Sequence, residues 1–211
     1  MRYLQGITTI PATEPDNPLI LGQAVHTGIE KSLEEAIREY CFRFPIITDE
    51  HINEIIKFET VIPLAKMAIP PGGQFEVEIK DDDFHGFIYY LVPATIFERG
   101  VELPDTYDLY DFKYSNNVSG YKQSGQLHEY KYFFEKNNPG KKIRNMFFVF
   151  IPKVTIRQKK TETLLEFRQR LKEALSGVEV KIVQIEFNIE KVIEFLFGIK
   201  AVNEETEFPQ E

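Results

Sequence analysis

A change of hydrophobic period is the feature that most constrains the fold of this chain. Between about residues 22 and 67 apolar side chains recur every three to four positions, whereas residues 75–80 alternate apolar with polar side chains and residues 86–92 form a second β-rich run. A period near 3.6 is typical of helices, and a period of two is typical of strands. Because the acidic residues 81–83 separate the two runs, the sequence predicts a β-hairpin after a helical segment.

The remaining elements follow from the same patterns. Helices are expected at about residues 22–43, 48–67, 121–136, 163–175 and 188–197, and further strands at about 107–114, 145–153 and 178–187. Thr48 is expected to cap the second helix and Pro63 to kink or break it, while Thr163 and Glu166 form a capping box. This order predicts an α/β fold with a mixed central β-sheet flanked by helices. We expect an irregular N-terminal arm at 1–20, one domain at 21–200 and an acidic, flexible tail at 201–211.

Cysteine content and hydropathy limit the classes of protein that the chain can belong to. Cys41 is the single cysteine among 211 residues, which excludes a disulfide framework and any cysteine-ligated zinc or iron–sulfur cluster within the chain. This fits a reducing cytoplasm. No signal segment opens the sequence, and no apolar run approaches the roughly 18–20 residues of a membrane span. We therefore expect a cytoplasmic protein without a membrane partner.

Charge is distributed unevenly along the chain. The formal net charge is −8, yet residues 111–160 carry 11 Lys and Arg against 3 Asp and Glu. A basic segment of this kind can follow the phosphate backbone of a nucleic acid, but it can equally solubilise surface loops. The charge pattern alone leaves these two interpretations open.

Asp111 and Lys113 form the first candidate site. They lie two positions apart in an expected strand, so both side chains leave the same face of the sheet. A carboxylate beside an ammonium can hold a divalent cation while the lysine orients water or stabilises a negatively charged transition state. The same spacing also describes an ordinary ion pair at a strand end, and this pair alone favours that simpler interpretation.

Two pairs with helical i,i+4 spacing are the next candidates. His26 and Glu30 lie on the first expected helix, where an imidazole can bind a metal or form a surface pair with the glutamate. Gln126 and Tyr130 lie on the helix that follows the Asp111 strand, where they can brace the lysine or contact phosphate. Each pair alone is more typical of ordinary helix packing than of a site.

The order of these motifs is more specific than any one of them. Gly22, His26 and Glu30 are followed by Gly86, then by Asp111-Phe112-Lys113, and then by the segment that holds Gln123, Gln126 and Tyr130. This arrangement, over roughly residues 18–155, resembles the RecB-like branch of the PD-(D/E)XK nuclease superfamily and is similar to phage and prophage recombination exonucleases. The resemblance implies a restriction-endonuclease-like αβββαβ core, one or two Mg²⁺ or Mn²⁺ ions, and hydrolysis of DNA phosphodiester bonds.

The resemblance also assigns roles to residues. His26, Asp111 and the backbone carbonyl of Phe112 match metal ligands, and Lys113 matches the lysine that activates water. Glu30, Gln126 and Tyr130 match residues that support the catalytic centre. The residues expected to contact DNA are Lys122, Gln123, Lys131, Lys141 and Lys142. DNA is the implied partner, with a recombinase, a single-strand-annealing protein and further copies of the chain left open. With Cys41 alone, the chain cannot belong to the members that carry an iron–sulfur cluster.

Tyr89 departs from the family pattern. Gly86 places the family's metal-binding aspartate at position 89, and this chain has a tyrosine there. A phenol with a pKa near 10 is a poor ligand for hard divalent cations, and the ring is large enough to fill the space of the ion. Three interpretations remain: the site binds DNA without cleaving it, position 89 differs from the natural residue, or another acid has become the ligand. The candidates for that acid are Glu76, Glu78, Glu102 and Asp108.

The sequence therefore leaves competing functions. The leading hypothesis is a metal-dependent DNA exonuclease-like hydrolase of phage-type recombination or DNA processing. The alternative is a catalytically impaired DNA-binding or assembly module on the same fold. A third is that the motifs are coincidental and the chain is a structural protein.

Overall fold

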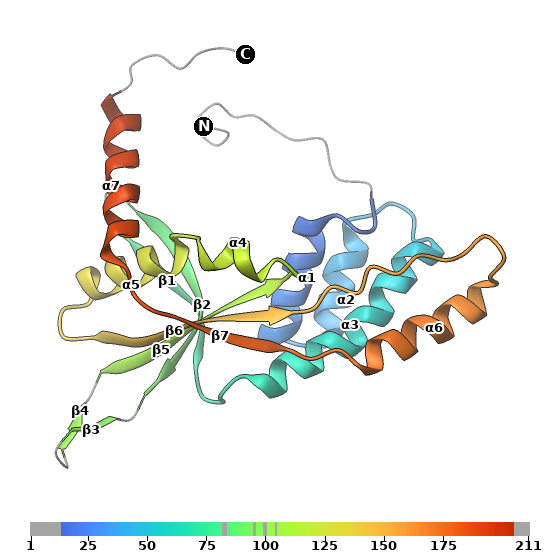
Figure 1. Cartoon of the computed structure of the whole chain (residues 1–211), viewed down its shortest axis with the longest axis horizontal. Coiled ribbons are helices and arrows are strands. Elements are labelled where there is room, and N and C mark those ends of the chain that lie inside the picture. The colour runs from blue at the N-terminus through green and yellow to red at the C-terminus, as the bar shows by residue number, and fades with distance from the viewer. Residues whose placement is uncertain (1–13, 82–83, 95, 99–100, 104, 205–211) are drawn as a thin grey trace. The chain divides into compact units, whose positions relative to one another are not determined.

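The computed structural model describes residues 14–81, 84–94, 96–98, 101–103 and 105–204, and it divides into two compact units. The helical unit contains residues up to Lys66 together with residues 154–178, and the sheet unit contains residues 67–153 and 179 onwards. Figure 1 labels the helices and strands of both units. Among the described residues, no helix combines the length and the apolar character that a membrane span requires.

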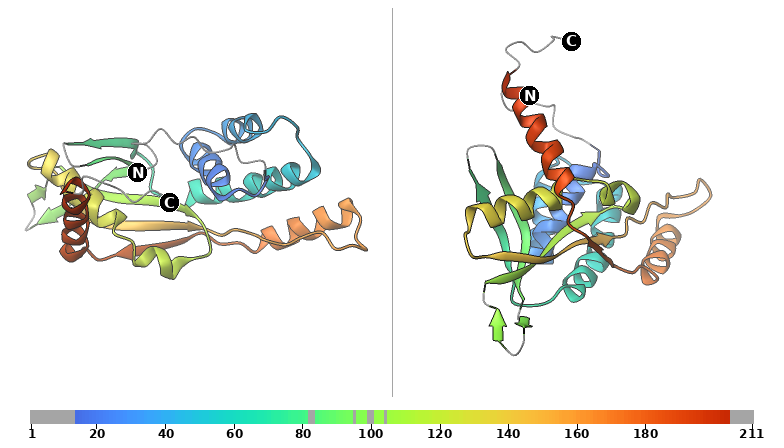
Figure 2. Two further views of the ribbon diagram at one scale, coloured as in Figure 1. Left: turned by 90° about the horizontal axis from the view of Figure 1, so that it is seen from above. Right: turned by 60° about the vertical axis from the view of Figure 1, so that its left-hand side comes forward.

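The helical unit consists of α1 (Pro18–Glu30), α2 (Leu33–Phe42), α3 (Asp49–Ala68) and α6 (Leu164–Ser176). The helices α1 and α2 lie side by side (Figure 2). A Cβ atom at Gly28 of α1 would collide with the side chain of Ile62 on α3, so glycine permits the close approach of these two helices. The capping box of Thr163 and Glu166 at the start of α6 is confirmed.

Two expectations for the helical unit were wrong. The helix expected at 22–43 is divided into α1 and α2, because Ser32 adopts an extended conformation and its side chain accepts a hydrogen bond from Glu35 N. The helix α3 continues through Pro63, where a kink or break was expected. Its buried residues on either side, Val61, Ile62 and Ala65, anchor the helix by packing, which compensates for the hydrogen bond that proline removes. The helix α1 begins at Pro18, after the cap formed by Asn17, so residues 18–20 of the expected irregular arm are helical.

The sheet unit contains a five-stranded mixed sheet in the order β1-β2-β5-β6-β7. The strands are β1 (Gln74–Lys80), β2 (His85–Pro93), β5 (Thr106–Tyr114), β6 (Lys142–Ile151) and β7 (Lys181–Ile185). The expected hairpin of β1 and β2 is confirmed as an antiparallel pair. The strands β5 and β6 are parallel and therefore need a crossover connection, which α4 (Val118–Lys122) and α5 (Gln126–Asn137) provide. The expected α/β fold, a mixed sheet flanked by helices, is confirmed.

Some details of the sheet unit differ from expectation. The helix expected at 121–136 is divided into α4 and α5, with Ser124 and Gly125 between them. A short hairpin of β3 (Ile96–Glu98) and β4 (Val101–Leu103) lies where a loop was expected. The last helix, α7 (Ile189–Glu204), includes the first residues of the expected acidic tail, and residues 205–211 lie outside the described part.

The helix α5 positions the candidate site by packing across the sheet. It contacts β1, β2 and β6, and α7 packs beside it (Figures 1 and 2). Leu127, Phe133 and Phe134 of α5 belong to one buried cluster with sheet residues that include Ile88 and Phe148. Gln126 and Tyr130 lie on this anchored helix, so their side chains are held over the strand that carries Asp111 and Lys113.

Candidate active site

The centre of the candidate site is an ion pair between Asp111 and Lys113 on β5. Asp111 is 0% exposed, and its Oδ2 lies 2.6 Å from Lys113 Nζ. Its Oδ1 has no hydrogen-bond partner among the described residues. A buried carboxylate oxygen without a partner costs free energy when it is ionised, and such atoms in native proteins call for an explanation such as a bound ion.

A hydrogen-bonded chain connects this ion pair to α5. Lys113 Nζ donates to Gln126 Oε1 at 2.8 Å, and Gln126 Nε2 donates to Tyr130 OH at 3.0 Å. Both amide atoms of Gln126 are therefore used, which fixes the orientation of its side chain. The structure thus brings together Asp111, Lys113, Gln126 and Tyr130, as the spacing of the motifs predicts.

Two aromatic rings complete the surroundings of the lysine. Lys113 Nζ lies 5.2 Å from the ring centroid of Tyr121 and 5.6 Å from that of Phe148. Aromatic faces at this distance attract a cation. Sequence reasoning did not find these rings. Phe148 faces Asp111 only through the β5–β6 register, and Tyr121 belongs to α4, which was expected as part of a longer helix.

Burial controls the protonation of the site. It raises the pKa of Asp111 despite the opposing effect of Lys113. It also raises the pKa of Tyr130 to about 12, against the hydrogen bond from Gln126 and with the added charge of Asp111. Tyr130 is therefore a neutral phenol at neutral pH.

Tyr89 lies beside this centre. The strands β2 and β5 are antiparallel, and Tyr90 of β2 pairs with Tyr110 of β5. The residue before Tyr90, which is Tyr89, therefore lies next to Asp111. Burial raises the pKa of Tyr89, and the charges of Asp111 and Glu76 raise it further. The residue at position 89 thus stands at the edge of the Asp111 site as a neutral phenol, which is not the ligand chemistry that a hard divalent cation prefers.

The alternative acids differ in their surroundings. The Glu78 carboxylate lies 3.0 Å from His85 Nε2. Asp108 is buried against Arg144, to which it binds through both carboxylate oxygens, and it also accepts a hydrogen bond from Asn145. The side chain of Glu102 lies outside the described part. Glu76 faces Tyr89 across the β1–β2 hairpin and forms no ion pair with another described residue.

His26 and Glu30 belong to the helical unit. They lie one turn apart on α1, where His26 is half-buried and borders the buried residues Val25 and Ile29. Their helical spacing is as expected, and their expected role toward a metal stays a prediction.

Of the residues expected to contact DNA, some are exposed and others are partly buried. The exposed ones are Lys122, Gln123 and Lys142, and the partly buried ones are Lys131 and Lys141. Lys122 and Gln123 are exposed at the end of α4. Lys142 is 67% exposed although it pairs with Glu135, whereas Lys131 is only 18% exposed and its ammonium binds both Glu135 and the Ile143 carbonyl. Lys141 is half-buried, with Nζ 5.9 Å from the ring centroid of Tyr107.

The donor chemistry of the site fits a divalent cation only in part. Asp111 offers a buried carboxylate oxygen without a hydrogen-bond partner, which is the type of oxygen that Mg²⁺ and Mn²⁺ bind. Tyr89 does not offer such an oxygen. No group of three His, Cys, Asp or Glu residues able to hold a metal ion occurs in the part of the chain that the structure describes.

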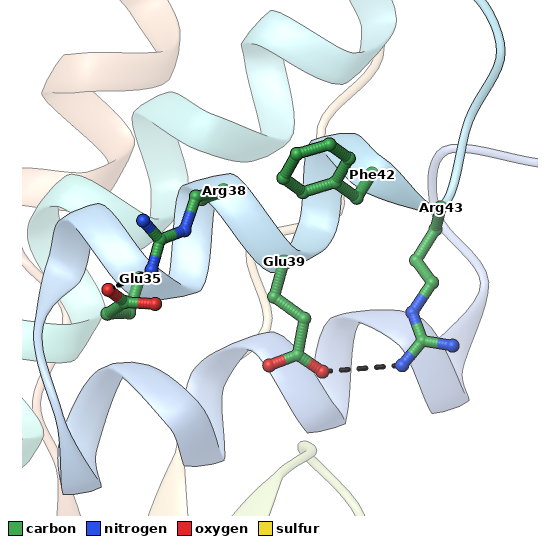
Figure 3. A pocket seen from close by; sticks show the side chains of 5 residues that line it. All are labelled: Glu35, Arg38, Glu39, Phe42 and Arg43. Atoms are coloured by element: carbon green, nitrogen blue, oxygen red, sulfur yellow. Dashed lines mark hydrogen bonds and ion pairs between the residues drawn. The ribbon is translucent and has the colours of Figure 1, made fainter.

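One pocket lies on α2 in the helical unit (Figure 3). It is lined by Glu35, Arg38, Glu39, Phe42 and Arg43. The two arginines form ion pairs with the two glutamates along the same helix, so the charges of the pocket neutralise each other. None of the residues predicted for the site lines this pocket.

Neither a family model nor a curated protein matches the sequence. A solved structure from Eubacterium rectale, described as a "putative exonuclease", is similar with a TM-score of 0.47 and 15% sequence identity. The similarity covers 95% of this chain and 69% of that one.

Proposed function

We propose that this chain is a nuclease-type protein that hydrolyses DNA phosphodiester bonds with the aid of a divalent cation. The observation that carries the proposal is the buried Asp111 carboxylate, which has an ion pair on one oxygen and no hydrogen-bond partner on the other. A cation at Oδ1 would offset the cost of burying this charge. The resemblance of the motifs supports a place in phage-type DNA recombination or processing in the cytoplasm, beside a recombinase or an annealing protein.

Each residue of the candidate site would have a distinct role in this reaction. Asp111 would hold Mg²⁺ or Mn²⁺ together with the Phe112 carbonyl. The resemblance also assigns a metal-ligand role to His26, which belongs to the helical unit. The bound ion would supply Lewis-acid stabilisation of the phosphate oxygens. Lys113 would orient the attacking water and stabilise negative charge on the reacting phosphate. Gln126, held in turn by Tyr130, would keep the lysine ammonium in place.

A second candidate function rests on Tyr89. A neutral phenol beside Asp111 leaves the site with fewer carboxylate ligands than such a nuclease uses. In this case the same fold would bind the DNA backbone through its lysines without cutting it, as a DNA-binding or assembly module. This binding would weaken steeply with rising salt concentration because it depends on contacts with phosphates.

A single set of assays tests both candidates. Linear single- and double-stranded DNA is incubated with the protein and Mg²⁺, Mn²⁺ or a chelator, and both binding and cleavage are measured. Metal-dependent cleavage that Lys113→Ala abolishes supports the hydrolase. Salt-sensitive binding without cleavage, combined with cleavage by Tyr89→Asp, supports the binding module. The absence of DNA binding at low salt would contradict both.

A further inference from the structure

Glu76 occupies a defined position relative to the candidate site. In the β1–β2 hairpin, Phe75 pairs with Tyr90 and Val77 pairs with Ile88, so Glu76 faces Tyr89. Tyr89 adjoins Asp111 on the next strand of the sheet, because β2 lies between β1 and β5. Glu76, Tyr89 and Asp111 are therefore neighbours at one level of three adjacent strands.

The backbone at Glu76 is unusual for a strand. Its φ angle is 51°, in the left-handed region that side-chain-bearing residues rarely adopt. The side chains before and after it pack on different groups: Phe75 contacts the rings of Tyr90 and Phe112, whereas Val77 packs against the cluster formed with α5. Glu76 is exposed between the half-buried Phe75 and Val77, so its carboxylate is accessible to a cation from solution.

Two observations about carboxylates point to Glu76. The other acids within the described part of this hairpin and of β5 are engaged, since Glu78 contacts His85 and Asp108 binds Arg144. Asp111, by contrast, is wholly buried and keeps one carboxylate oxygen without a hydrogen-bond partner. A cation shared between two carboxylates would satisfy this oxygen and would not require an aspartate at position 89.

We propose that Glu76 supplies the second carboxylate of a divalent-cation site with Asp111, in place of the aspartate that the family pattern expects at position 89. This inference rests on the proposed function, since it completes the same site. The charge of Glu76 already acts on Tyr89, which lies between the two acids along the sheet. Removing the carboxylate at position 76 should therefore weaken cation binding, although the resemblance assigns no role to this position.

The test is a titration of the full chain with Mn²⁺ alone, followed by the electron paramagnetic resonance signal of free Mn²⁺. We expect the unmodified protein to bind, Glu76→Gln to bind at least about tenfold more weakly, and Asp111→Asn to lose binding. Glu76→Asp should retain most of the affinity because it keeps a carboxylate. Glu78→Gln is the matched control: it removes a neighbouring exposed acid of the same strand and should bind as the unmodified protein does.

The outcomes separate this inference from the proposed function. If Glu76→Gln binds Mn²⁺ as tightly as the unmodified protein, Glu76 is not a ligand. If both proteins then cleave DNA in a metal-dependent way, the proposed hydrolase function is still supported. If the unmodified protein does not bind Mn²⁺ and Tyr89→Asp does, the inference is wrong and the site needs its family aspartate. If neither protein binds Mn²⁺ or cleaves DNA, both the inference and the hydrolase fail.

Discussion

Gln126 Oε1 accepts a hydrogen bond from Lys113 Nζ at 2.8 Å, which ties the strand β5 to the first turn of α5. The other end of the same amide donates to Tyr130, so a rotation of the Gln126 side chain would break two hydrogen bonds at once. The ammonium is therefore positioned by the folded helix as well as by Asp111. This coupling makes the lysine geometry sensitive to substitutions on α5.

The first prediction concerns this coupling. Gln126→Leu should lower DNA cleavage by about tenfold or more, because a displacement of the lysine on the order of 1 Å is costly in an active site. Tyr130→Phe keeps the ring but removes the acceptor for Gln126, and it should lower the free energy of unfolding by about 1 kcal/mol with a smaller effect on cleavage. Cleavage rates and urea denaturation measure the two effects, in the Tyr89→Asp background if the unmodified protein is inactive. Undiminished cleavage by Gln126→Leu would show that the lysine does not depend on the helix.

The second prediction concerns the stability of the protein against pH. Burial raises the pKa of Asp111 above its ordinary value of 3.8, so the folded state holds this proton more tightly than the unfolded state does. The free energy of unfolding should therefore fall as pH rises from about 3.8 to the folded pKa of Asp111. Asp111→Asn removes this dependence.

Thermal unfolding of both proteins across pH 3–8 measures the effect. The difference in Tm, unmodified protein minus Asp111→Asn, should decrease as pH increases through that window. A difference that increases with pH would mean that the carboxylate is better stabilised in the folded protein than its burial indicates.

The third prediction separates two lysines of the basic segment. Lys142 is largely exposed, so Lys142→Gln should weaken DNA binding and reduce the slope of log affinity against log salt concentration by about one. Lys131 is mostly buried and binds Glu135 and the Ile143 carbonyl, so Lys131→Gln should mainly lower the free energy of unfolding. DNA-binding isotherms at several salt concentrations, together with denaturation, measure both. An unchanged slope for Lys142→Gln would remove this residue from the DNA-binding surface.

Much of the fold could be predicted from the sequence because periodic patterns are local. The β1–β2 hairpin, the strand of Asp111 and the capping box at Thr163 all depend on residues close together in the chain. The divisions at Ser32 and Gly125 were missed, because the apolar period continues across both positions while the local backbone does not. A capping side chain or a glycine can end a helix within a single residue, which a periodic pattern does not register.

The site shows the same division between local and non-local information. Lys113 and Gln126 could be paired from their order along the chain, and the structure brings them together. The positions of the Tyr121 and Phe148 rings around the lysine could not be predicted, since they depend on strand register and on the start of α4. The left-handed backbone of Glu76 likewise has no sequence signal, because no glycine or asparagine marks it.

The last prediction tests whether the conformation of Glu76 costs stability. The left-handed region costs a residue with a Cβ atom about 1–2 kcal/mol, and glycine avoids this cost while it loses about 0.5–1 kcal/mol through the greater freedom of its unfolded chain. Glu76→Gly should therefore raise the free energy of unfolding by up to about 1.5 kcal/mol. Glu76→Asn, which tolerates this region, should be close to the unmodified protein, and the β-branched Glu76→Val should be less stable.

Urea denaturation of the four proteins gives the order of stability, with the slope against denaturant as a check that the unfolded state is unchanged. The Mn²⁺ affinity is measured on the same samples. All three substitutions remove the carboxylate, so all three should weaken Mn²⁺ binding to a similar extent. A more stable Glu76→Gly protein that has lost Mn²⁺ affinity would mean that the strained backbone is retained for the carboxylate it carries. If Glu76→Gly is instead less stable than Glu76→Val, the left-handed conformation is not a source of strain, and the position of Glu76 requires another explanation.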